Sequence, residues 1–513
     1  MTQEPRKPFN PGDILAGLSV ALVAIPQTLA YAELAGMPAY TGLYAVALPA
    51  LAASFFVSSP YLQTGPVATT SLLTFGILSS LAATRSPEYI ALAALLALVV
   101  GLVRVLIGLL KWGTVAYLLS QPVLMGFMSA AAILIFSSQL PTALGVTPPH
   151  AGVLFGALWT LLHPGNWHPA AALLSLITVL LIRGGRRLHH LFPGVLIAVA
   201  LGILYSLEFH YRGAIIGSIP AGLPALSLEL PWRAIPNLVI GGVTIALVGF
   251  SEASSIARTF ATLDRLRWNP NREFISQGVA NLASGLSGGF PVGASFARSA
   301  INRLAGAQTR WAGAVTGLAI LAFLPFVTIL SPLPKAILAA IVISAIASLM
   351  RLPQLFELRR YSRSQAYIAW LTFAMTLGFS PRIDVAVILG IALAIAQHLR
   401  RERQLVLEHQ LEGHVLYFQP RGVLWFGSAS RMQERFTTLL ANNPEIHAVK
   451  LKLGGLGRID LSAAIMLRNL ITDVRRAGLE IELLEVPPMA RAWSARLWRE
   501  ALDVPLGSHP LDD

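Results

Sequence analysis

Two short stretches decide how this sequence folds: GPVATTS at residues 65–71 and FPVGASF at residues 290–296. Each one interrupts apolar sequence with proline and glycine, and each continues into small residues that can begin a helix. Pro66 lies 53 residues after the first apolar run begins at residue 13, and Pro291 lies 56 residues after a later run begins at residue 235. Two such interruptions at nearly the same position in each half of the sequence predict two structural repeats.

The composition is that of a membrane protein. Of 513 residues, 55% are hydrophobic and 12% are charged, whereas soluble domains average about 45–50% and about 25%. The chain has no cysteine, which excludes a cysteine nucleophile, a thiolate metal site and a redox disulfide.

Fourteen apolar runs predict fourteen membrane spans, although several are shorter than the about 20 residues that a straight span needs. The runs are 13–31, 40–58, 66–84, 88–110, 121–140, 168–183, 193–206, 235–256, 274–289, 295–308, 311–330, 336–350, 364–380 and 383–399. Seven spans in each half, about 13–206 and about 235–399, give the halves opposite orientations in the membrane. The fold expected is therefore a polytopic α-helical membrane domain over 13–399, built from two inverted repeats.

The distribution of basic residues predicts the orientation of these spans. With the N-terminus inside, alternate connections hold 19 Lys and Arg, and the opposite connections hold five: Arg85, Arg212, Arg233, Lys335 and Arg382. Residues 1–12 then form a short cytoplasmic segment without a signal-peptide cleavage site, so we expect no processed segment. Residues 400–513, with 15 basic and 14 acidic residues, read as a cytoplasmic domain. The net charge of +13 is explained by topology, and no nucleic-acid partner is expected.

The interruptions at Pro66 and Pro291 predict an anion site. A proline at the first helical turn leaves the following backbone N–H groups without partners, and a helix N-terminus carries roughly +0.5 charge. Two half-helices that begin near the middle of the bilayer and face each other would form a cup of N–H groups for an anion. The alternative is that each proline only kinks a long helix.

Four motifs resemble those of the sulfate permease (SulP) family of anion transporters. PQTLAYA at 26–32 resembles P-Q-x-x-A-Y-A, GLY at 42–44 matches G-L-Y, and GPVA at 65–68 matches G-P-x-A. SFARSAIN at 295–302 resembles S-F-S-R-S-A-V-N, with Ala297 in place of the second serine. Thr41 and Pro60 also depart from the family pattern. The resemblance covers nearly the whole chain.

The resemblance implies a core and a gate domain, with the anion held between the starts of spans three and ten while the core moves like an elevator. It places Val67 and Ala68 at the first helix start and Ser295, Phe296 and Ala297 at the second. Because Ala297 lacks the hydroxyl that helps to hold the anion in relatives, the substrate stays open among sulfate, bicarbonate and dicarboxylates. We also expect a homodimer in the inner membrane of a bacterial cell.

Two polar side chains in the first span are candidate substrate contacts. Gln27 can donate its amide N–H groups to an oxyanion, and the alternative is a hydrogen bond between helices. Tyr31 lies one turn further on the same face and resembles the aromatic wall of the pocket in the family, with core packing as the alternative.

Two charged residues complete the candidate site. Arg298 lies one turn into span ten, where its cation would add to the field around an anion; the alternative is that it extends to the cytoplasmic interface. Glu252 is a candidate for coupling to a proton, or to sodium, since protonation removes its repulsion of the anion. Its alternative is a salt bridge to Arg298. Glu33 ends span one and is expected at the outer interface.

The tail alternates strand and helix patterns and resembles the STAS domain. Strands are predicted at 415–418, 423–426, 449–453 and 479–486, and helices at 430–440, 462–477 and 488–501. Asp460-Leu461-Ser462-Ala463 falls at the D-x-S-G loop of that domain. Ser462 matches a serine that is phosphorylated in STAS antagonists, and we expect it to act here as a helix cap.

The function predicted is secondary active transport of a small oxyanion, coupled to protons. An uncoupled channel or exchanger of the same fold, a nucleobase carrier and a membrane-anchored sensor are the alternatives. No enzyme is expected, since the sequence offers no nucleophile–base pair. No cofactor and no metal are expected either, because His163, His168, His189 and His190 fall in loops without ligand spacing.

Overall fold

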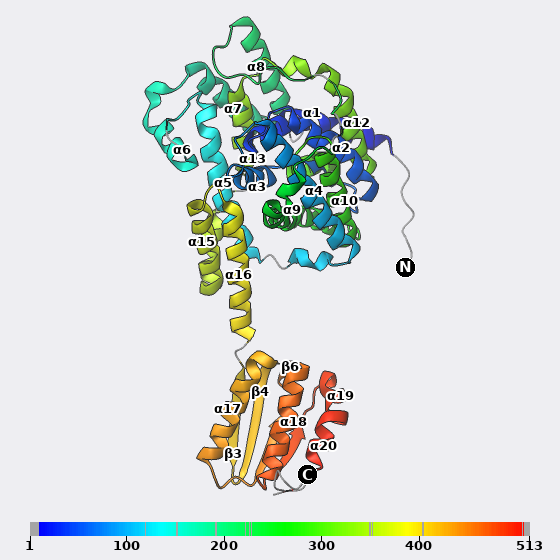
Figure 1. Ribbon diagram of the computed structural model, residues 1–513, viewed down its shortest axis with the longest axis vertical. Helices are drawn as coiled ribbons and strands as arrows, with labels where there is room; N and C mark the ends of the chain where they lie inside the picture. Colours follow the sequence, from blue (N-terminus) through cyan, green and yellow to red (C-terminus); the bar gives the residue numbers. More distant parts are fainter. Residues whose placement is uncertain are drawn as a thin grey trace. The chain divides into compact units, whose positions relative to one another are not determined.

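The computed structural model describes residues 10–117, 120–149, 152–189, 192–220, 222–224, 226, 228–347, 350, 352–402, 405–504 and 506. The chain divides into two compact units, Met1–Ile391 and Ala392–Asp513, and each is described by itself (Figure 1).

The first unit is helical, and its helices fall into two successive sets. The first set is α1 (Pro11–Leu34), α2 (Thr41–Phe56), α3 (Ala68–Leu78), α4 (Pro87–Leu109), α5 (Gln121–Ala143), α6 (Val153–Leu162), α7 (Pro169–Leu188) and α8 (Gly194–Glu208). The second set is α9 (Ile235–Leu263), α10 (Pro270–Leu286), α11 (Phe296–Leu304), α12 (Trp311–Phe323), α13 (Lys335–Ile346), α14 (Leu352–Tyr361), α15 (Arg363–Gly378) and α16 (Ile383–Glu402), the last of which continues past Ile391 into the second unit.

Each of the fourteen apolar runs coincides with one of these helices, whereas α6 and α14 were not predicted. Both have ten residues, too few for a span, and both lie between the fifth and sixth predicted spans of their repeat. By length and composition, six helical segments of the described residues could cross a membrane: Pro11–Leu34, Pro87–Leu109, Gln121–Ala143, Trp232–Leu263, Trp311–Leu330 and Ile383–Arg400. The other spans stay predictions.

The contacts between the two sets of helices have the form that an inverted repeat produces. α2 packs against α12, and its counterpart α10 packs against α4. In the same way α1 packs against α12 and α9 against α4, while α5 packs against α15 and α13 against α7. Exchanging each helix for its counterpart in the other repeat therefore turns the first pair of each comparison into the second.

The helices of the first unit gather into two bundles. The first bundle contains α1 to α4 and α9 to α12, and Figure 1 shows α4, α9 and α10 of this bundle side by side. The second bundle contains α5, α7, α8, α13 and α15. The bundles meet where α1 contacts α5, α8 and α13 and where α3 contacts α5.

Close packing within the first bundle depends on Gly42, the glycine of the GLY motif. A Cβ added there would lie 2.0 Å from the carbonyl oxygen of Thr28, so only glycine lets α2 pass α1 at this distance. The GLY motif, which supports the family resemblance, therefore also has a role in helix packing.

The second unit is an α/β domain with a five-stranded sheet. Its elements are β3 (Val406–Glu412), β4 (Val415–Leu424), α17 (Phe426–Asn442), β5 (Ala448–Lys452), β6 (Leu456–Ile459), α18 (Leu461–Arg476), β7 (Glu480–Leu484), α19 (Arg491–Trp493) and α20 (Arg499–Leu502). The strand order is β3-β4-β5-β7, and β6 pairs with β4. The pair β3–β4 is antiparallel, and the pairs β4–β5, β4–β6 and β5–β7 are parallel.

Several predictions for the tail were wrong in detail. The strands predicted at 415–418 and 423–426 are one strand, β4, and the polar edge strand β3 was missed because it lacks an apolar pattern. The final helix, predicted at 488–501, is present as a continuous helical segment over 488–502, although its winding changes from 3-10 to α, to π and back to α.

The helix cap predicted at Ser462 is made by Asp460 instead. The Asp460 carboxylate accepts a hydrogen bond of 2.8 Å from the Ala463 backbone N–H and a second of 3.1 Å from the Phe426 N–H. α18 begins at Leu461, so Ser462 lies within its first turn with an exposed side chain. The acidic residue takes the cap because it directly precedes the helix.

Candidate functional site

The candidate site is built around a crossing of two extended segments, one from each repeat. β1 (Thr64–Gly65) pairs antiparallel with β2 (Gly293–Ala294), so that Thr64 lies opposite Ala294 and Gly65 opposite Gly293. α3 begins three residues after β1, and α11 begins two residues after β2. The pairing therefore brings the starts of two short helices together from segments that are more than two hundred residues apart.

The prolines do not occupy the first helical turns, contrary to the prediction. α3 begins at Ala68 with Val67 as its N-cap residue, which leaves Pro66 just outside the helix. α11 begins at Phe296 with Ser295 as its N-cap, and Pro291 precedes β2. Proline acts here by keeping the chain extended before the helix, so the feature shared by the repeats is the strand pairing.

The two helix starts differ in how their backbone N–H groups are satisfied. Val67 offers no side-chain cap to α3, whose first turn carries the N–H groups of Ala68, Thr69 and Thr70. At α11 the Ser295 Oγ accepts a hydrogen bond of 3.4 Å from the Arg298 N–H. The start of α3 is thus the more open of the two to an anion, and the Ser295 hydroxyl keeps a hydrogen that it can donate.

A polar network from α10 holds the crossing in place. The Gln277 Nε2 donates to the Thr64 Oγ1 over 2.8 Å. One turn later, the Asn281 side chain accepts from the Val292 N–H at 2.9 Å and donates to the Val292 carbonyl at 3.0 Å. The Gln63 N–H donates to the Ser299 Oγ at 2.9 Å. Gln277 and Asn281 are buried amides at positions i and i+4 of α10, and this spacing was a signal that the sequence predictions did not use.

Arg298 connects the two helix starts directly. Its side chain is 1% exposed, and its Nη2 donates a hydrogen bond of 2.8 Å to the Pro66 carbonyl at the entry to α3. A Cβ on Gly65 would lie 3.3 Å from the same nitrogen, so glycine leaves room for the guanidinium. The Nε and Nη1 of Arg298 have no hydrogen-bond partner among the described residues. A buried cation with two unused donors is suited to receive an anion.

Tyr31 and Glu252 both lie within electrostatic range of this guanidinium. Tyr31 is buried on α1, and Glu252 is half-buried on α9. Gln27 is buried one turn before Tyr31, just after Pro26 inside α1, a helix that packs on both α3 and α11. Residues predicted from three separate spans thus lie on helices that meet at the crossing.

The other residues predicted to contact the substrate differ in how deeply their side chains are buried. Val67 and Ala68 are buried at the start of α3, and Ala297 is half-buried in the first turn of α11. Phe296 is 54% exposed, and its ring stacks on Phe260 of α9 with the centroids 5.9 Å apart. The backbone of Phe296 belongs to the helix start, while its side chain lies away from Arg298.

A second buried arginine, Arg104 of α4, was not singled out from the sequence. It is fully buried, and its Nε and Nη2 donate to the carbonyls of Ala246 and Ile245 at 3.1 Å each, while its Nη1 donates to the Val292 carbonyl at 2.9 Å. It therefore fixes α4 to α9 and to the segment that leads into β2. An arginine inside a predicted span was the signal available.

The far end of α11 carries a partly exposed ion pair. The Arg303 Nε and Nη2 donate to the Asp264 carboxylate at 3.0 and 2.6 Å. This hydrogen-bonded guanidinium lowers the pKa of Asp264 below its ordinary value. The pair joins the ends of α9 and α11 and takes no part in the crossing.

Comparison with known proteins agrees with this architecture. The sulfate permease family matches residues 11–372, and the STAS domain matches residues 384–495. The chain is 31% identical to the probable sulfate transporter MT1781 of Mycobacterium tuberculosis, across 93% of this chain and 89% of that relative.

Two solved structures are similar over most of their length. The murine solute carrier 26 family member A9 anion transporter, in the inward-facing state, aligns with a TM-score of 0.88 at 20% identity, over 99% of this chain and 91% of that one. The transmembrane domain of the cyanobacterial bicarbonate transporter BicA aligns with a TM-score of 0.64 at 26% identity, over 75% and 97%.

Proposed function

The chain belongs to the sulfate permease family, whose members are membrane transporters and not enzymes, and from that premise we propose that it is a secondary active, proton-coupled symporter of a small oxyanion. Sulfate, bicarbonate and small dicarboxylates are the substrate candidates. An uncoupled channel or exchanger for the same anions is the alternative.

The observation that carries this proposal is the crossing of β1 and β2. It joins the N-termini of α3 and α11, each with the partial positive charge of a helix start, beside the two unused donors of Arg298. An anion bound there would receive backbone N–H groups from both repeats and charge-assisted hydrogen bonds from the guanidinium. The missing hydroxyl at Ala297 favours an anion that does not depend on that donor.

Alternating access would follow from movement of one bundle against the other. All of the candidate site residues lie on α1, α3, α9 and α11 or next to them, and thus in the first bundle. A bound anion would travel with this bundle past the second one, as an elevator mechanism requires.

Glu252 is the proposed coupling group. Its carboxylate lies within electrostatic range of Arg298, where it competes with an anion for the same positive charge. Protonation removes that competition, so a proton and an anion would bind together. Sodium is the alternative coupling ion.

The membrane setting follows from the charges and the relatives. We propose a homodimer in a bacterial inner membrane with both termini in the cytoplasm, supported by the excess of Lys and Arg in alternate connections. In this orientation the end of α1 that carries Glu33 faces outward.

The test is uptake into proteoliposomes under an imposed inward proton gradient. Radiolabelled sulfate, bicarbonate and a dicarboxylate are offered separately, and the proposal expects one of them to accumulate above equilibrium and to be released by a protonophore. Glu252→Gln should lose this accumulation while still catalysing downhill exchange. Glu88→Gln, at an exposed acidic residue in the first turn of α4, is the matched control and should transport normally.

Two other results would contradict the proposal in different ways. Downhill flux that ignores the gradient for every anion would favour the channel or exchanger and remove the coupling role of Glu252. If no anion moved in either direction, anion transport itself would be wrong.

A further inference from the structure

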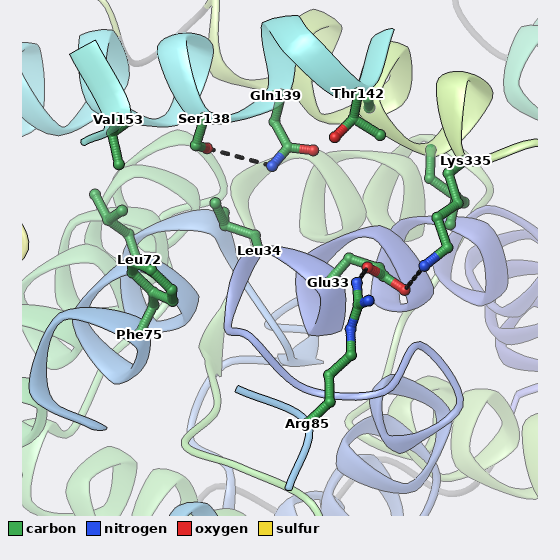
Figure 2. A pocket seen from close by; sticks show the side chains of 12 residues that line it. Glu33, Leu34, Leu72, Phe75, Arg85, Ser138, Gln139, Thr142, Val153 and Lys335 are labelled. Atoms are coloured by element: carbon green, nitrogen blue, oxygen red, sulfur yellow. Dashed lines mark hydrogen bonds and ion pairs between the residues drawn. The ribbon is translucent and has the colours of Figure 1, made fainter. Parts of the chain in front are cut away.

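A cavity of about 240 Å³ lies between the two bundles, at the Glu33 end of α1. Figure 2 shows the Glu33 carboxylate between the Lys335 ammonium group and the Arg85 guanidinium. The Lys335 Nζ donates to one carboxylate oxygen at 3.0 Å, and Arg85 donates to the other. The remaining wall comes from α1, α3, α5, α6 and α13, and it includes Leu72 and Phe75 of α3 and Ser138, Gln139 and Thr142 of α5.

The ion pair joins the two bundles. Glu33 ends α1 in the first bundle, and Lys335 begins α13 in the second. Their side chains are 16% and 18% exposed, whereas Arg85, from the segment before α4, is 52% exposed. The pair is therefore largely shielded at a place where the bundles must slide or separate if the first one moves.

The cavity lies close to the proposed substrate site along α3. Leu72 and Phe75 follow Ala68, the first residue of α3, by four and seven residues. At 1.5 Å per residue, these positions are about 6 and about 10 Å from the helix start. The cavity therefore lies one to two turns of α3 away from the crossing, on the Glu33 side.

The chemistry of the wall fits a small anion. Two cationic side chains face one carboxylate, which leaves an excess of positive charge, and the hydroxyl of Thr142 and the second amide N–H of Gln139 add hydrogen-bond donors. The Ser138 hydroxyl is already used, because it donates to the Ile135 carbonyl at 2.8 Å and accepts from the Gln139 Nε2. The Glu33 carboxylate is itself a planar oxyanion held by an ammonium and a guanidinium group. Its oxygens mark the positions that the oxygens of a free oxyanion would take.

We propose that this cavity is a second anion-binding site, at which an external small oxyanion displaces the Glu33 carboxylate from Lys335 and Arg85. The proposal rests on the proposed function, both for the anion and for the outward direction of this end of α1. Displacement releases the contact between the bundles, so an external anion favours the conformation in which the bundles separate on this side. A ligand shifts the conformational equilibrium only by such a difference in affinity.

Competition with Glu33 has a consequence that a purely structural ion pair lacks. Glu33→Gln removes the competing charge, so anion binding should become tighter, by up to about fivefold, the upper range for a partly exposed pair. If Glu33 only held the bundles together, the same substitution would reduce stability and leave anion affinity unchanged.

The experiment measures the unfolding midpoint of the full chain in detergent against sodium sulfate or sodium bicarbonate, with sodium gluconate keeping the ionic strength constant. A ligand that binds the folded state raises this midpoint in a saturable way. The measurement is made in an Arg298→Gln background, where the proposed substrate site lacks its guanidinium; Gln27→Ala replaces that background if Arg298→Gln does not fold.

The proposal expects a saturable response in this background, a lower apparent Kd after Glu33→Gln, and loss of the response after Lys335→Gln. Arg212→Gln removes an exposed basic residue of another outer connection and should leave the response unchanged. An unchanged or weaker affinity after Glu33→Gln would overturn the competition. A response in the native chain that disappears in both backgrounds would show that only the substrate site binds the anion.

Failure of the proposed function would look different. In that case neither the native chain nor any variant responds to sulfate or bicarbonate, and the proteoliposomes take up no anion. The second site would then be excluded together with the first.

Discussion

Two arginines in the membrane domain are buried to the same degree and differ in what they touch. Arg104 donates three hydrogen bonds to the carbonyls of Ile245, Ala246 and Val292. Arg298 donates one, to the Pro66 carbonyl, and two of its nitrogens have no hydrogen-bond partner among the described residues. Burial alone therefore does not distinguish the two residues, whereas hydrogen bonding does.

The difference separates a structural charge from a functional one. A buried guanidinium whose three nitrogens all donate to the protein gains less from an anion, and its free energy is tied to the fold. A buried guanidinium with unpaired N–H groups raises the free energy of the folded state until a ligand accepts their hydrogen bonds. Such a residue is therefore suited to binding a ligand. We infer that Arg104 positions the entry to β2 and that Arg298 binds the anion.

The largest effect is expected at Arg104. Arg104→Met removes the donor from three buried carbonyls and should lower the free energy of unfolding by about 2–4 kcal/mol, since each lost buried hydrogen bond is worth about 1 kcal/mol or more. The thermal midpoint of the full chain in detergent measures this loss, with Arg267→Met, at an exposed arginine, as the control. If Arg104→Met were as stable as the native chain but failed to transport, Arg104 would act in anion transport like Arg298 and not as a structural residue.

Arg298 should show the opposite pattern. Arg298→Gln breaks one hydrogen bond within the protein but removes charge-assisted contacts to the anion, so we expect uptake at low substrate concentration to fall about tenfold to a hundredfold. Its unfolding midpoint in the absence of substrate should stay near that of the native chain. Arg298→Lys keeps the charge without the planar donors and should restore part of the uptake. A fall in stability as large as that of Arg104→Met would mean that both arginines are structural.

The smallest effect is expected at Asp264, whose partner Arg303 is a third arginine, on the same helix as Arg298 but 35% exposed. Asp264→Asn should reduce stability by less than about 1 kcal/mol, because a partly exposed ion pair is screened by solvent. The guanidinium lowers the pKa of the Asp264 carboxyl, so the pair stabilises the fold above the unfolded pKa of about 3.9 and is lost as the pH falls through the lower folded value.

Unfolding midpoints of the native chain and Asp264→Asn should therefore differ by the same small amount from about pH 5 to pH 8. Only at more acidic pH should the two curves converge. A difference that disappears already near neutral pH would assign the effect to another group.

Much of the fold could be predicted because its signals are local. Apolar runs located all fourteen predicted helices, and the alternation of strands and helices located the α/β tail. Local signals also had limits: α6 is too short to read as a span, and the edge strand β3 is too polar to read as a strand.

The candidate site could be predicted only in part. Glu252 was predicted as a carboxylate that can bind a proton beside the anion. Gln27 and Arg298 were predicted because polar residues are unusual inside apolar spans, and Tyr31 because it lies one turn after Gln27 on the same face. Arg104, Gln277 and Asn281 obey the same rule and were missed because no motif drew attention to them. The motif placed Phe296 at the second helix start, where its backbone lies, while its side chain packs against Phe260.

The sequence by itself determined where helices can form and where they must break, since apolar length, proline and glycine act on the chain locally. Only the tertiary structure decided which broken ends meet, because the pairing of Gly65 with Gly293 joins residues too far apart for any local pattern to link. It also decided that Lys335 meets Glu33 and that one buried arginine is satisfied while the other is not. The physical reason is the same in each case. The free-energy contribution of a buried polar group depends on partners that only folding brings within hydrogen-bond distance.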